Sequence, residues 1–282
     1  MNTNYKFRYP TAMTIAGSDS GGGAGIQADL KTFSALGVFG VSAITAITAQ
    51  NTCGVRNIQA VSPDVLRGQI EAVWEDITVD ALKIGMLHNK EAICIVAEEI
   101  DRFHPKWTVL DPVMISTSGS KLLEDETISH LIELLFKRAD LITPNRDEAA
   151  FLTGITINNM QQMEEAGHHL LDMGCKAVLM KGGDMPDLEN SNDLLMVRGE
   201  KPLLLATPKI ATPNTHGTGC TLSSAITAYL ALGESLQDAV QKGKAYVTQA
   251  LKEGYQIRVG KGHGPVNHFW NPQPLHKIDL SE

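Results

Sequence analysis

A glycine-rich segment late in the chain, Thr212 to Cys220, has the composition of an anion-binding turn. It precedes a helical pattern rich in Ala, Ser and Thr, so Gly217, Thr218 and Gly219 would place free backbone N–H groups at a helix N-terminus, where negative charge is favoured. A phosphoryl group in transfer spreads charge over its equatorial oxygens, and preorganised donors there lower the barrier. A structural helix cap would account for the Gly and Thr residues, but less readily for a cysteine in the first turn. The segment therefore favours phosphoryl transfer.

A second glycine-rich segment, Gly17 to Gly25, lies near the start of the chain. The stretch from Gly23 to Ala28 fits the GxGxxG/A pattern of dinucleotide sites, which also needs an acidic residue about 20 positions later. Residues 44–52 offer no carboxylate, and the segment lacks the GK[ST] ending of a P-loop. Two interpretations remain. The segment is either a tight strand-to-helix turn or a backbone that closes on a small substrate, with Asp29 one helical turn further on.

Both loops must be positioned by the elements around them, and strand-like apolar runs alternate with helical patterns along the chain. One helical face is marked by Ile93, Val96, Ile100 and Phe103, which recur at helical spacing. We expect strands at 12–17, 41–49, 81–85, 107–113, 140–143 and 177–181, and a meander over 193–210. Helices are expected at 25–36, from 63 onward, and at 124–136, 217–232 and 236–253.

Repeated strand–helix–strand units predict an α/β fold, with a mostly parallel central sheet and helices on both faces in three α/β/α layers. Since no linker or internal repeat is visible, we expect one domain over residues 11–270, with tails at 1–10 and 271–282. In open sheets of this kind, ligands bind beyond the carboxyl ends of the strands. The loops of interest therefore follow Gly17, Ala49, Gly85, Val113, Thr143 and Lys181.

The composition excludes several classes of protein. The 282 residues carry a formal net charge of −8 and no basic run, whereas nucleic-acid binders usually present a basic stripe. Two uncharged stretches, 32–55 and 210–233, are dotted with polar residues that would be costly in hydrocarbon, and the N-terminal segment lacks the apolar core of a secretory signal. The cysteines are scattered without a CxxC pair, which argues against a zinc site or a disulfide framework. We therefore expect a cytoplasmic protein with neither nucleic acid nor membrane as partner.

Seven motifs follow one another in unbroken order between Met13 and His268. They are Ala16–Phe33, Ala49–Thr52, Lys83–Met86, Asp111–Met114, Thr143–Asn145 with Glu148, Met180–Gly183 and Thr215–Cys220. Together they resemble the motifs of hydroxymethylpyrimidine and phosphomethylpyrimidine kinases, which belong to the ribokinase-like superfamily. The resemblance covers nearly the whole chain, and an ordered series of motifs is far more specific than any single one.

The resemblance implies a pyrimidine pocket lined by Gly17, Asp29, Gln50, Met86 and Val113. Gln50 matches the residue that reads the aminopyrimidine edge, because a carboxamide can donate and accept hydrogen bonds at once. Its alternative role is that of an ordinary loop amide. Met86 and Val113 would be apolar walls of the pocket, although such residues at strand ends are often part of the core.

For the phosphates, the resemblance implies that Asn145, Lys181 and Thr218 lie near ATP. Asp111 and Glu148 would lie near a magnesium ion, a hard cation that prefers carboxylate oxygens and waters. Lys181 ends an apolar strand, where an unpaired ammonium would be costly, so we expect a phosphate partner for it.

In the wider ribokinase group, the residue after Gly-Thr-Gly is an aspartate that takes the proton of the substrate hydroxyl. Here that residue is Cys220, and a cysteine at a helix N-terminus has a lowered pKa, so we expect a thiolate. Cys220→Ala should lower kcat by about 10²–10⁴-fold, the usual contribution of a general base. His216 borders the same turn and shows no metal-ligand spacing, so we expect either a surface or loop histidine or a residue that contacts phosphate.

The expected activity is transfer of phosphate from ATP, with Mg²⁺, to the hydroxymethyl group of 4-amino-5-hydroxymethyl-2-methylpyrimidine, and then to its monophosphate, in thiamine biosynthesis. Pyridoxal or pyridoxine kinase is the alternative, although the segment 115–120 lacks the lid cysteine of the related two-cysteine pyridoxal kinases. A non-catalytic ligand sensor is a third hypothesis, against which the intact motifs argue. The resemblance also implies a homodimer.

Overall fold

The computed structural model describes residues 5–114, 125–183, 185 and 189–281. The strands are β1 (Phe7–Arg8), β2 (Thr11–Asp19), β3 (Phe39–Asn51), β4 (Gly54–Ala60), β5 (Ala81–Ile84), β6 (Thr108–Leu110), β7 (Leu141–Ile142), β8 (Ala177–Met180), β9 (Asn190–Val197), β10 (Leu203–Pro208) and β11 (Ile278–Asp279). The helices are α1 (Gly25–Ala35), α2 (Pro63–Trp74), α3 (Lys90–Phe103), α4 (Asp125–Leu135), α5 (Arg146–Thr153), α6 (Met160–Asp172), α7 (Thr218–Ala231) and α8 (Leu236–Gly254), with a short 3₁₀ turn at Phe136–Arg138.

A nine-stranded sheet forms the centre of the molecule, in the order β10-β9-β8-β7-β6-β5-β2-β3-β4. The six strands from β8 to β3 in this order are parallel, while β9, β10 and β4 join antiparallel at the two edges. The mostly parallel sheet predicted from the strand–helix alternation is therefore confirmed. Because parallel strands end at the same edge, the loops that follow them converge there.

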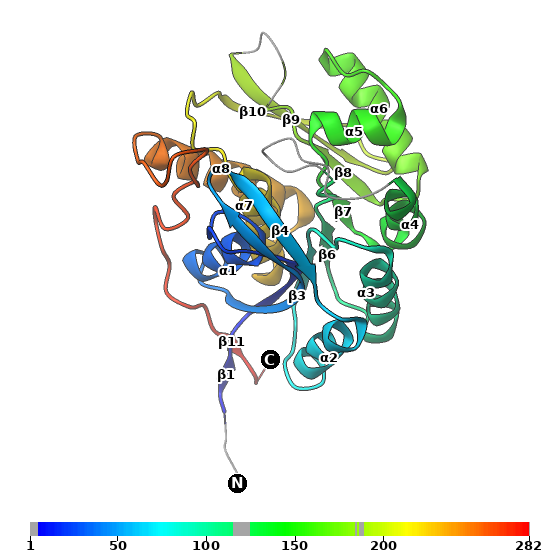
Figure 1. The fold of residues 1–282 in the computed structure, drawn as a ribbon, viewed down its shortest axis with the longest axis vertical. Helices are drawn as coiled ribbons and strands as arrows, with labels where there is room; N and C mark the ends of the chain where they lie inside the picture. The colour runs from blue at the N-terminus through cyan, green and yellow to red at the C-terminus, as the bar shows by residue number, and fades with distance from the viewer. Residues whose placement is uncertain (1–4, 115–124, 184, 186–188, 282) are drawn as a thin grey trace.

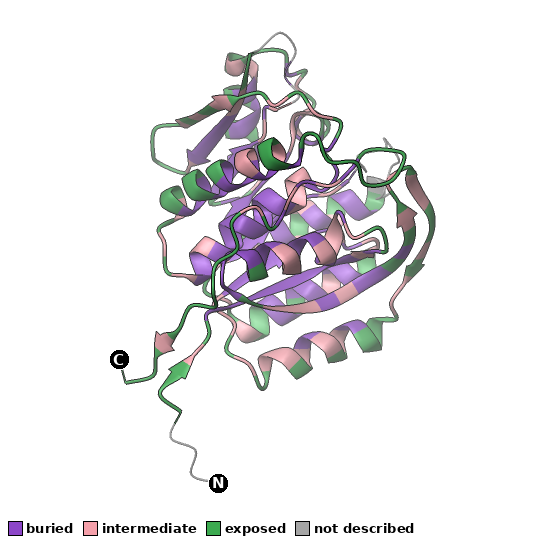
Figure 2. Ribbon diagram, turned by 90° about the vertical axis from the view of Figure 1, so that its left-hand side faces the viewer, coloured by how far each residue is buried: buried purple, intermediate pink, exposed green. Residues whose placement is uncertain are grey.

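Alternating side chains of the parallel strands enter two separate cores. Met13 and Ile15 of β2 join the core beneath α2 to α6, whereas Ala12 joins the core beneath α1, α7 and α8. Val178 and Leu179 of β8 divide in the same way. This two-residue period places helices on both faces of the sheet, as predicted (Figure 1), and the buried residues lie mainly in the central strands and the helices that cover them (Figure 2).

The β3–β4 hairpin was not predicted, because we expected a strand at 41–49 alone. In the structure β3 extends to Asn51, and β4 returns beside it in an antiparallel register with an irregularity at Gln50. None of the residues of β4 is fully buried, so its sequence lacks the apolar alternation on which strand prediction relies. The hairpin carries Gln50 to the edge of the sheet where the loops converge.

The two ends of the chain pair with each other. Residues expected to be tails form the antiparallel strands β1 and β11, with Phe7 opposite Asp279 and Arg8 opposite Ile278. This pair projects from the body of the molecule (Figure 1). Arg8 also reaches the body through an ion pair with Asp80, at 2.7 Å.

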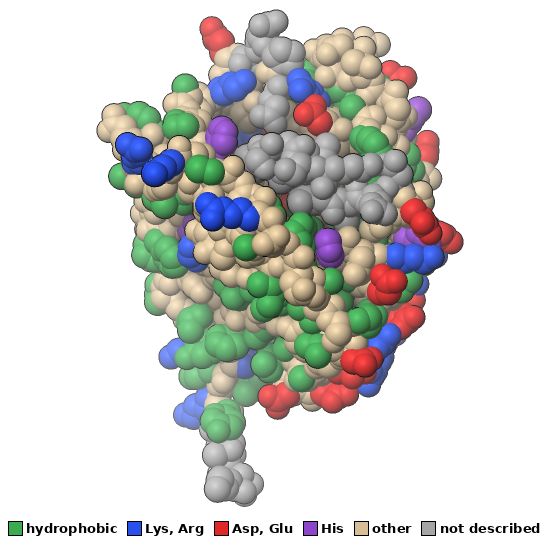
Figure 3. Space-filling model, viewed as in Figure 1, with side chains coloured by type: hydrophobic (Ala, Val, Ile, Leu, Met, Phe, Trp, Pro, Cys, Tyr) green, Lys and Arg blue, Asp and Glu red, His purple; other side chains and the backbone are tan. Residues whose placement is uncertain are grey.

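The outer surface agrees with the composition. Acidic and basic side chains are mixed on the face that Figure 3 shows, without a broad basic stripe. Among the helices of the described residues, none is long and apolar enough to cross a membrane.

Candidate active site

A cavity of about 780 Å³ lies where the strand-end loops converge. Its walls include both glycine-rich loops, and most of the residues singled out from the sequence line it. These are Gly17, Gln50, Met86, Asp111, Val113, Asn145, Glu148, Lys181, Gly217, Thr218, Gly219 and Cys220. The structure therefore brings these residues to one place, although their individual roles stay predictions.

The turn before α7 has the geometry of an anion site. Gly217 is the residue before the helix and has φ = 77°, a left-handed conformation that favours glycine. It also packs against the first glycine-rich loop, since a Cβ on Gly217 would lie 1.8 Å from the carbonyl oxygen of Gly23. The amides of Gly219 and Cys220 follow in the first turn, where N–H groups have no acceptor within the helix. These N–H groups border the cavity and are suited to bind an oxyanion.

Lys181 approaches this turn from the end of β8. A Cβ on Gly219 would lie 3.1 Å from its Nζ, a tight contact that the Lys181 side chain would have to relieve by shifting. The phosphate partner expected for Lys181 stays a prediction; within the protein, Nζ lies 3.0 Å from Asp111 Oδ1. Asp111 also accepts hydrogen bonds from the hydroxyls of Thr143, at 2.9 Å, and Ser223, at 3.3 Å. Burial lowers the pKa of Lys181, but the charges of Asp111 and Glu148 outweigh it and raise the pKa above its ordinary value.

Asn145 and Glu148 hold each other at the start of α5. The side chain of Asn145 accepts from the N–H of Glu148 and the side chain of Glu148 accepts from the N–H of Asn145, both at 2.8 Å. This reciprocal cap fixes both side chains at the cavity wall. Burial raises the pKa of Glu148 to about 7; Lys181 lowers it and the charge of Asp111 raises it further. Asp111 and Glu148 are therefore close enough to repel each other.

Asp29 does not line the cavity, so its predicted contact with substrate is corrected. Its carboxylate is fully buried behind the cavity and pairs with Lys83, with Nζ–O distances of 3.0 and 2.8 Å. Hydroxyls of Thr14 and Ser224 donate to its two oxygens, each at 2.6 Å. The sequence placed Asp29 one turn into α1, but it could not reveal a lysine 54 residues away as the partner.

The surroundings of Cys220 favour the neutral thiol, whereas its position at the start of a helix led us to expect a thiolate. Burial raises the pKa of Cys220 to about 11, and the nearby charges of Asp29 and Asp111 raise it further. Lys83 and the backbone N–H of Gly25 lower it, but they do not offset the other effects. The thiol therefore keeps its proton near neutral pH.

Two residues at the site were missed or misjudged from the sequence. His216 is buried and not at the surface, and its Nε2 lies 2.9 Å from Oδ2 of Asp19. Asp19 belongs to the first glycine-rich loop, where we considered only the glycines. The two residues are 197 positions apart, so only the packing of the two loops against each other brings them together.

The end of the cavity away from Gln50 was also not predicted. It combines an apolar wall, formed by Pro208, Ile210, Val247 and Leu251, with a buried ion pair. That pair joins Lys244 to Asp193 at 2.7 Å. The wall comes from the end of β10, the loop after it and α8, none of which carries a recognisable motif. Its signal in the sequence is indistinguishable from that of ordinary core residues.

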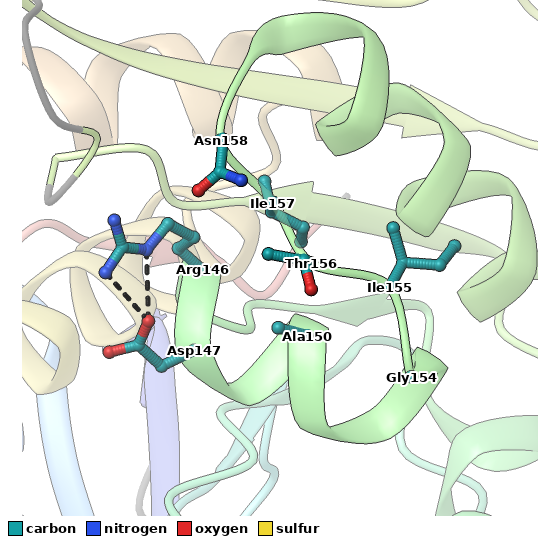
Figure 4. Close-up of a pocket in the computed structure, with 8 residues that line it drawn as sticks. All are labelled: Arg146, Asp147, Ala150, Gly154, Ile155, Thr156, Ile157 and Asn158. Atoms are coloured by element: carbon teal, nitrogen blue, oxygen red, sulfur yellow. Dashed lines mark hydrogen bonds and ion pairs between the residues drawn. The ribbon is translucent and has the colours of Figure 1, made fainter.

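A second cavity of about 280 Å³ lies between α5 and the loop that follows it. It is lined by Arg146, Asp147, Ala150, Gly154, Ile155, Thr156, Ile157 and Asn158 (Figure 4). Its charged side chains pair with each other, with Arg146 Nε 3.0 Å from Asp147 Oδ1. Both of these charged side chains are partly exposed, whereas the larger cavity is lined by most of the residues singled out from the sequence, so the larger cavity is the candidate active site.

Comparison with known proteins agrees with this geometry. A family model described as phosphomethylpyrimidine kinase matches residues 19–267. The chain is 47% identical over 258 residues to the hydroxymethylpyrimidine/phosphomethylpyrimidine kinase of Bacillus subtilis (strain 168), covering 92% of this chain and 94% of the relative. It is 46% identical over 259 residues to the kinase of the same name from Salmonella typhimurium, covering 92% and 97%.

Solved structures give the same result. A phosphomethylpyrimidine kinase from Clostridium difficile 630 aligns with a TM-score of 0.76 and 47% identity, covering 86% of this chain and 99% of that chain. An ADP complex of Bacillus subtilis pyridoxal kinase aligns with a TM-score of 0.83 and 37% identity, covering 92% and 96%. These likenesses confirm the ribokinase-like fold that the motifs implied. With its family match over most of its length and relatives at nearly half identity, the chain belongs to the phosphomethylpyrimidine kinase family.

Proposed function

We propose that the larger cavity transfers phosphate from ATP to the hydroxymethyl group of 4-amino-5-hydroxymethyl-2-methylpyrimidine, and then to the monophosphate so formed. The chain is a kinase of hydroxymethylpyrimidine and its phosphate that acts in thiamine biosynthesis. One observation carries the assignment of the site: the N-terminal amides of α7, the Lys181 ammonium and the carboxamide of Gln50 all face one cavity. This combination places hydrogen-bond donors that can stabilise a phosphoryl group in transfer in the same cavity as a carboxamide that can hydrogen-bond a nitrogen-containing ring.

The residues of the cavity then have distinct roles in a single displacement at the γ-phosphorus of ATP. The ring binds at Gln50, between Met86 and Val113, and its hydroxymethyl oxygen attacks the γ-phosphorus as the bond to ADP breaks, without a phosphoenzyme. The amides of Gly219 and Cys220, together with Lys181, stabilise the charge that develops on the γ-phosphoryl oxygens. Cys220 is the candidate acceptor for the hydroxyl proton. Because its thiol starts protonated, only the minor thiolate form can act as a base.

The nucleotide base fits the opposite end of the cavity, against the apolar wall of Pro208, Ile210, Val247 and Leu251. Related kinases have been solved with ADP or AMP-PCP bound. Asn145 and Thr218 line the same cavity, and we propose that they lie near the phosphates.

A magnesium ion fits the two carboxylates beside the phosphate site. Among the described residues, no group of three or more His, Cys, Asp or Glu side chains could hold a metal. Magnesium usually takes one or two carboxylates, with waters and substrate phosphates as its other ligands. Asp111 and Glu148 match that pattern. The pKa of Glu148 is raised mainly by burial and further by the charge of Asp111, so a cation held by these carboxylates would favour the ionised form of Glu148. When bound, the ion supplies positive charge that neutralises the phosphates.

The test is release of ADP from ATP with each candidate alcohol. We expect turnover with the hydroxymethylpyrimidine and with its monophosphate. Turnover with pyridoxal alone would contradict the assignment, and no turnover with any of these alcohols would favour a ligand sensor. Pyridoxal kinase is retained as the alternative because the Staphylococcus aureus enzyme, solved with AMP-PCP and pyridoxal, aligns with a TM-score of 0.85 at 35% identity.

The homodimer and the cytoplasmic location stay predictions. A mass measurement in solution tests the first: a homodimer has twice the mass of the 30.5 kDa chain. Fractionation of cells that produce the protein tests the second.

A further inference from the structure

A nearly buried ion pair lines the cavity on the side where we propose that the nucleotide binds. Lys244 Nζ lies 2.7 Å from Asp193 Oδ2, and the exposed fractions of the two side chains are 6% and 3%. Both residues nevertheless line the cavity, together with Ser191. Because a buried ion pair repays its desolvation only when its hydrogen-bonding capacity is satisfied, the unused capacity of this pair is informative.

The ammonium of Lys244 has one hydrogen left for a ligand. It donates to Ser191 Oγ at 2.8 Å and faces Asp193, and these are its two acceptors among the described residues. An ammonium carries three hydrogens, so at least one is free. Since Lys244 lines the cavity, an oxygen or nitrogen of a bound ligand can accept that hydrogen.

The carboxylate of Asp193 likewise keeps part of its accepting capacity. Its Oδ1 accepts the backbone N–H of Gly182 at 3.0 Å, and its Oδ2 faces Lys244. A carboxylate has about four lone-pair sites, so these two contacts leave sites on both oxygens. The pair therefore offers a bound ligand one donor and one acceptor next to each other.

The pair lies directly beside the proposed phosphate site. Gly182, which donates to Asp193, follows Lys181 in the chain. In the register of β8 and β9, Met180 is opposite Leu194, so Asp193 is level with Lys181 at the end of the sheet. The Lys181 ammonium in turn borders the first turn of α7. A ligand whose phosphate lies at that turn must therefore pass the ion pair with its next part.

The apolar wall lies beyond the pair. Strand β10 runs in the same direction as β8, and Leu205 is opposite Asp193, so Pro208 lies three positions farther toward the converging loops. On α8, the next two turns after the lysine of the pair carry Val247 and Leu251 on the same helical face, which borders the cavity. The cavity wall thus runs from a phosphate site, through a donor–acceptor pair, to an apolar surface.

We propose that the Lys244–Asp193 pair binds the ribose hydroxyls of the nucleotide, and that it makes the kinase prefer a ribonucleotide to one that lacks these hydroxyls. The proposal rests on the function proposed above. A nucleotide joins phosphate, sugar and base in the same order as the three parts of the cavity wall. Two neighbouring hydroxyls match the pair, because one can accept from Lys244 while the other donates to Asp193.

Removing both ribose hydroxyls leaves the two charged groups without their ligand partners. Hydrogen bonds to charged groups contribute more than neutral ones, so the wild-type protein should favour ATP over 2′,3′-dideoxy-ATP by about 10- to 100-fold in kcat/KM. The measurement is made at a saturating concentration of the hydroxymethylpyrimidine. The difference should lie mainly in the KM for the nucleotide, because the hydroxyls take no part in the transfer itself.

The test measures the same ratio in a variant that neutralises the pair. Asp193→Asn/Lys244→Met removes both charges together, so neither is left buried alone, and an amide carbonyl can still accept the N–H of Gly182. The preference for ATP should fall about tenfold or more. Arg8→Met/Asp80→Asn is the matched control: it neutralises an ion pair of the same length whose carboxylate also accepts a backbone N–H, but neither residue lines the cavity, so the preference should remain.

The outcomes separate the two proposals. If the wild-type protein phosphorylates the pyrimidine with neither nucleotide, the proposed function fails. If it uses ATP and 2′,3′-dideoxy-ATP with equal kcat/KM, this inference is overturned while the proposed function stands. That comparison needs no variant, so it decides even if the double variant does not fold. A folded double variant that raises the KM for both nucleotides equally would give the pair a structural role only, and would also overturn the inference.

Discussion

Two lysine–aspartate pairs lie close together at the cavity, and they differ in exposure. Lys83, in β5, pairs with Asp29 at 2.8 Å, and neither side chain has any exposed surface. Lys181, after β8, pairs with Asp111 at 3.0 Å, but 15% of the Lys181 side chain is exposed to the cavity. Both pairs join an ammonium to a carboxylate, but only the Lys181–Asp111 pair has exposed surface that a ligand could contact.

In the closed pair, Lys83 and Asp29, groups of the protein itself donate hydrogen bonds to both carboxylate oxygens. Both oxygens of Asp29 receive a hydroxyl hydrogen bond in addition to the ammonium. A buried ion pair repays its desolvation only when the remaining hydrogen-bonding capacity is satisfied in this way. In the open pair, Lys181 and Asp111, the partly exposed ammonium can also bind a ligand. We propose that the closed pair stabilises the floor of the site and that Lys181 of the open pair binds phosphate during the reaction.

The largest expected effect concerns Cys220, whose charge environment includes both pairs. Cys220→Ala should lower kcat by about 10²–10⁴-fold and leave the KM for ATP nearly unchanged. Since the pKa of the thiol is about 11, the thiolate fraction grows about tenfold per pH unit below that value, so kcat of the wild-type protein should rise between pH 7 and 9. The pH profile of kcat with saturating substrates measures this. A flat profile, or a variant with unchanged turnover, would reduce Cys220 to a wall of the pocket.

The next effect breaks the closed pair. Asp29→Ala leaves the Lys83 ammonium buried without a counter-ion, so the free energy of unfolding should fall by about 3–5 kcal/mol. Urea unfolding at pH 7 measures it, and the double variant Asp29→Leu/Lys83→Met should recover most of the loss. Asp101→Ala, which opens an exposed pair with Arg138, is the control and should cost about 1 kcal/mol or less. A loss at Asp29 as small as at Asp101 would contradict a structural role for the closed pair.

The open pair should respond in activity more than in stability. Lys181→Met removes a charge from the developing phosphoryl oxygens, so kcat should fall by about 10²–10³-fold. Asp111 keeps its hydrogen bonds from Thr143 and Ser223, which limits the loss of folding stability. Steady-state kinetics and urea unfolding of the same variant test both statements. Lys176→Met, at an exposed pair with Asp140, should leave kcat unchanged. If Lys181→Met were unstable but fully active, the two pairs would have the same role.

The smallest effect concerns a buried ionisable group without a counter-ion. Burial, with the nearby positive charges, lowers the pKa of His268 to about 4, and its Nε2 has no hydrogen-bond partner among the described residues. The unfolded chain takes up this proton from about pH 6.5, so stability is complete above that pH and falls by about 2–3 kcal/mol as pH drops toward 4.

Urea unfolding between pH 7 and 4.5 tests the sign of this effect. His268→Phe should remove that part of the pH dependence, whereas His168→Gln, at an exposed position, should retain it. A wild-type protein that gains stability on acidification over this range would contradict the buried, neutral state of His268.

The parts of the fold that could be predicted have a strong period. The parallel strands alternate between two cores, and β8 was predicted within one residue, at 177–181 against Ala177–Met180. The hairpin strand β4 could not be predicted, because its half-exposed residues follow no apolar period. The pairing of β1 with β11 joins residues at opposite ends of the chain, which local propensity cannot reveal.

The site shows the same limit. Motif resemblance located the residues that line the cavity, because each motif lies at the end of a strand. It misplaced Asp29 and overlooked the pair of Asp19 and His216, because these side chains are defined by partners far away in the sequence. It also predicted a thiolate at Cys220 from the helix position alone, whereas burial has the larger effect. The partners and the burial of these side chains therefore depend on long-range packing, which local sequence patterns do not reveal.

The central claim is that the turn before α7 and Lys181 receive the γ-phosphate while Gln50 holds the alcohol in the same cavity. A crystal structure of the protein with the hydroxymethylpyrimidine and a non-hydrolysable ATP analogue tests it most directly. We predict γ-phosphate oxygens within hydrogen-bonding distance of the Gly219 and Cys220 amides and of Lys181 Nζ, and the pyrimidine edge at Gln50 with its hydroxymethyl group toward the phosphorus. A γ-phosphate bound away from this turn, or a pyrimidine that does not contact Gln50, would contradict the account.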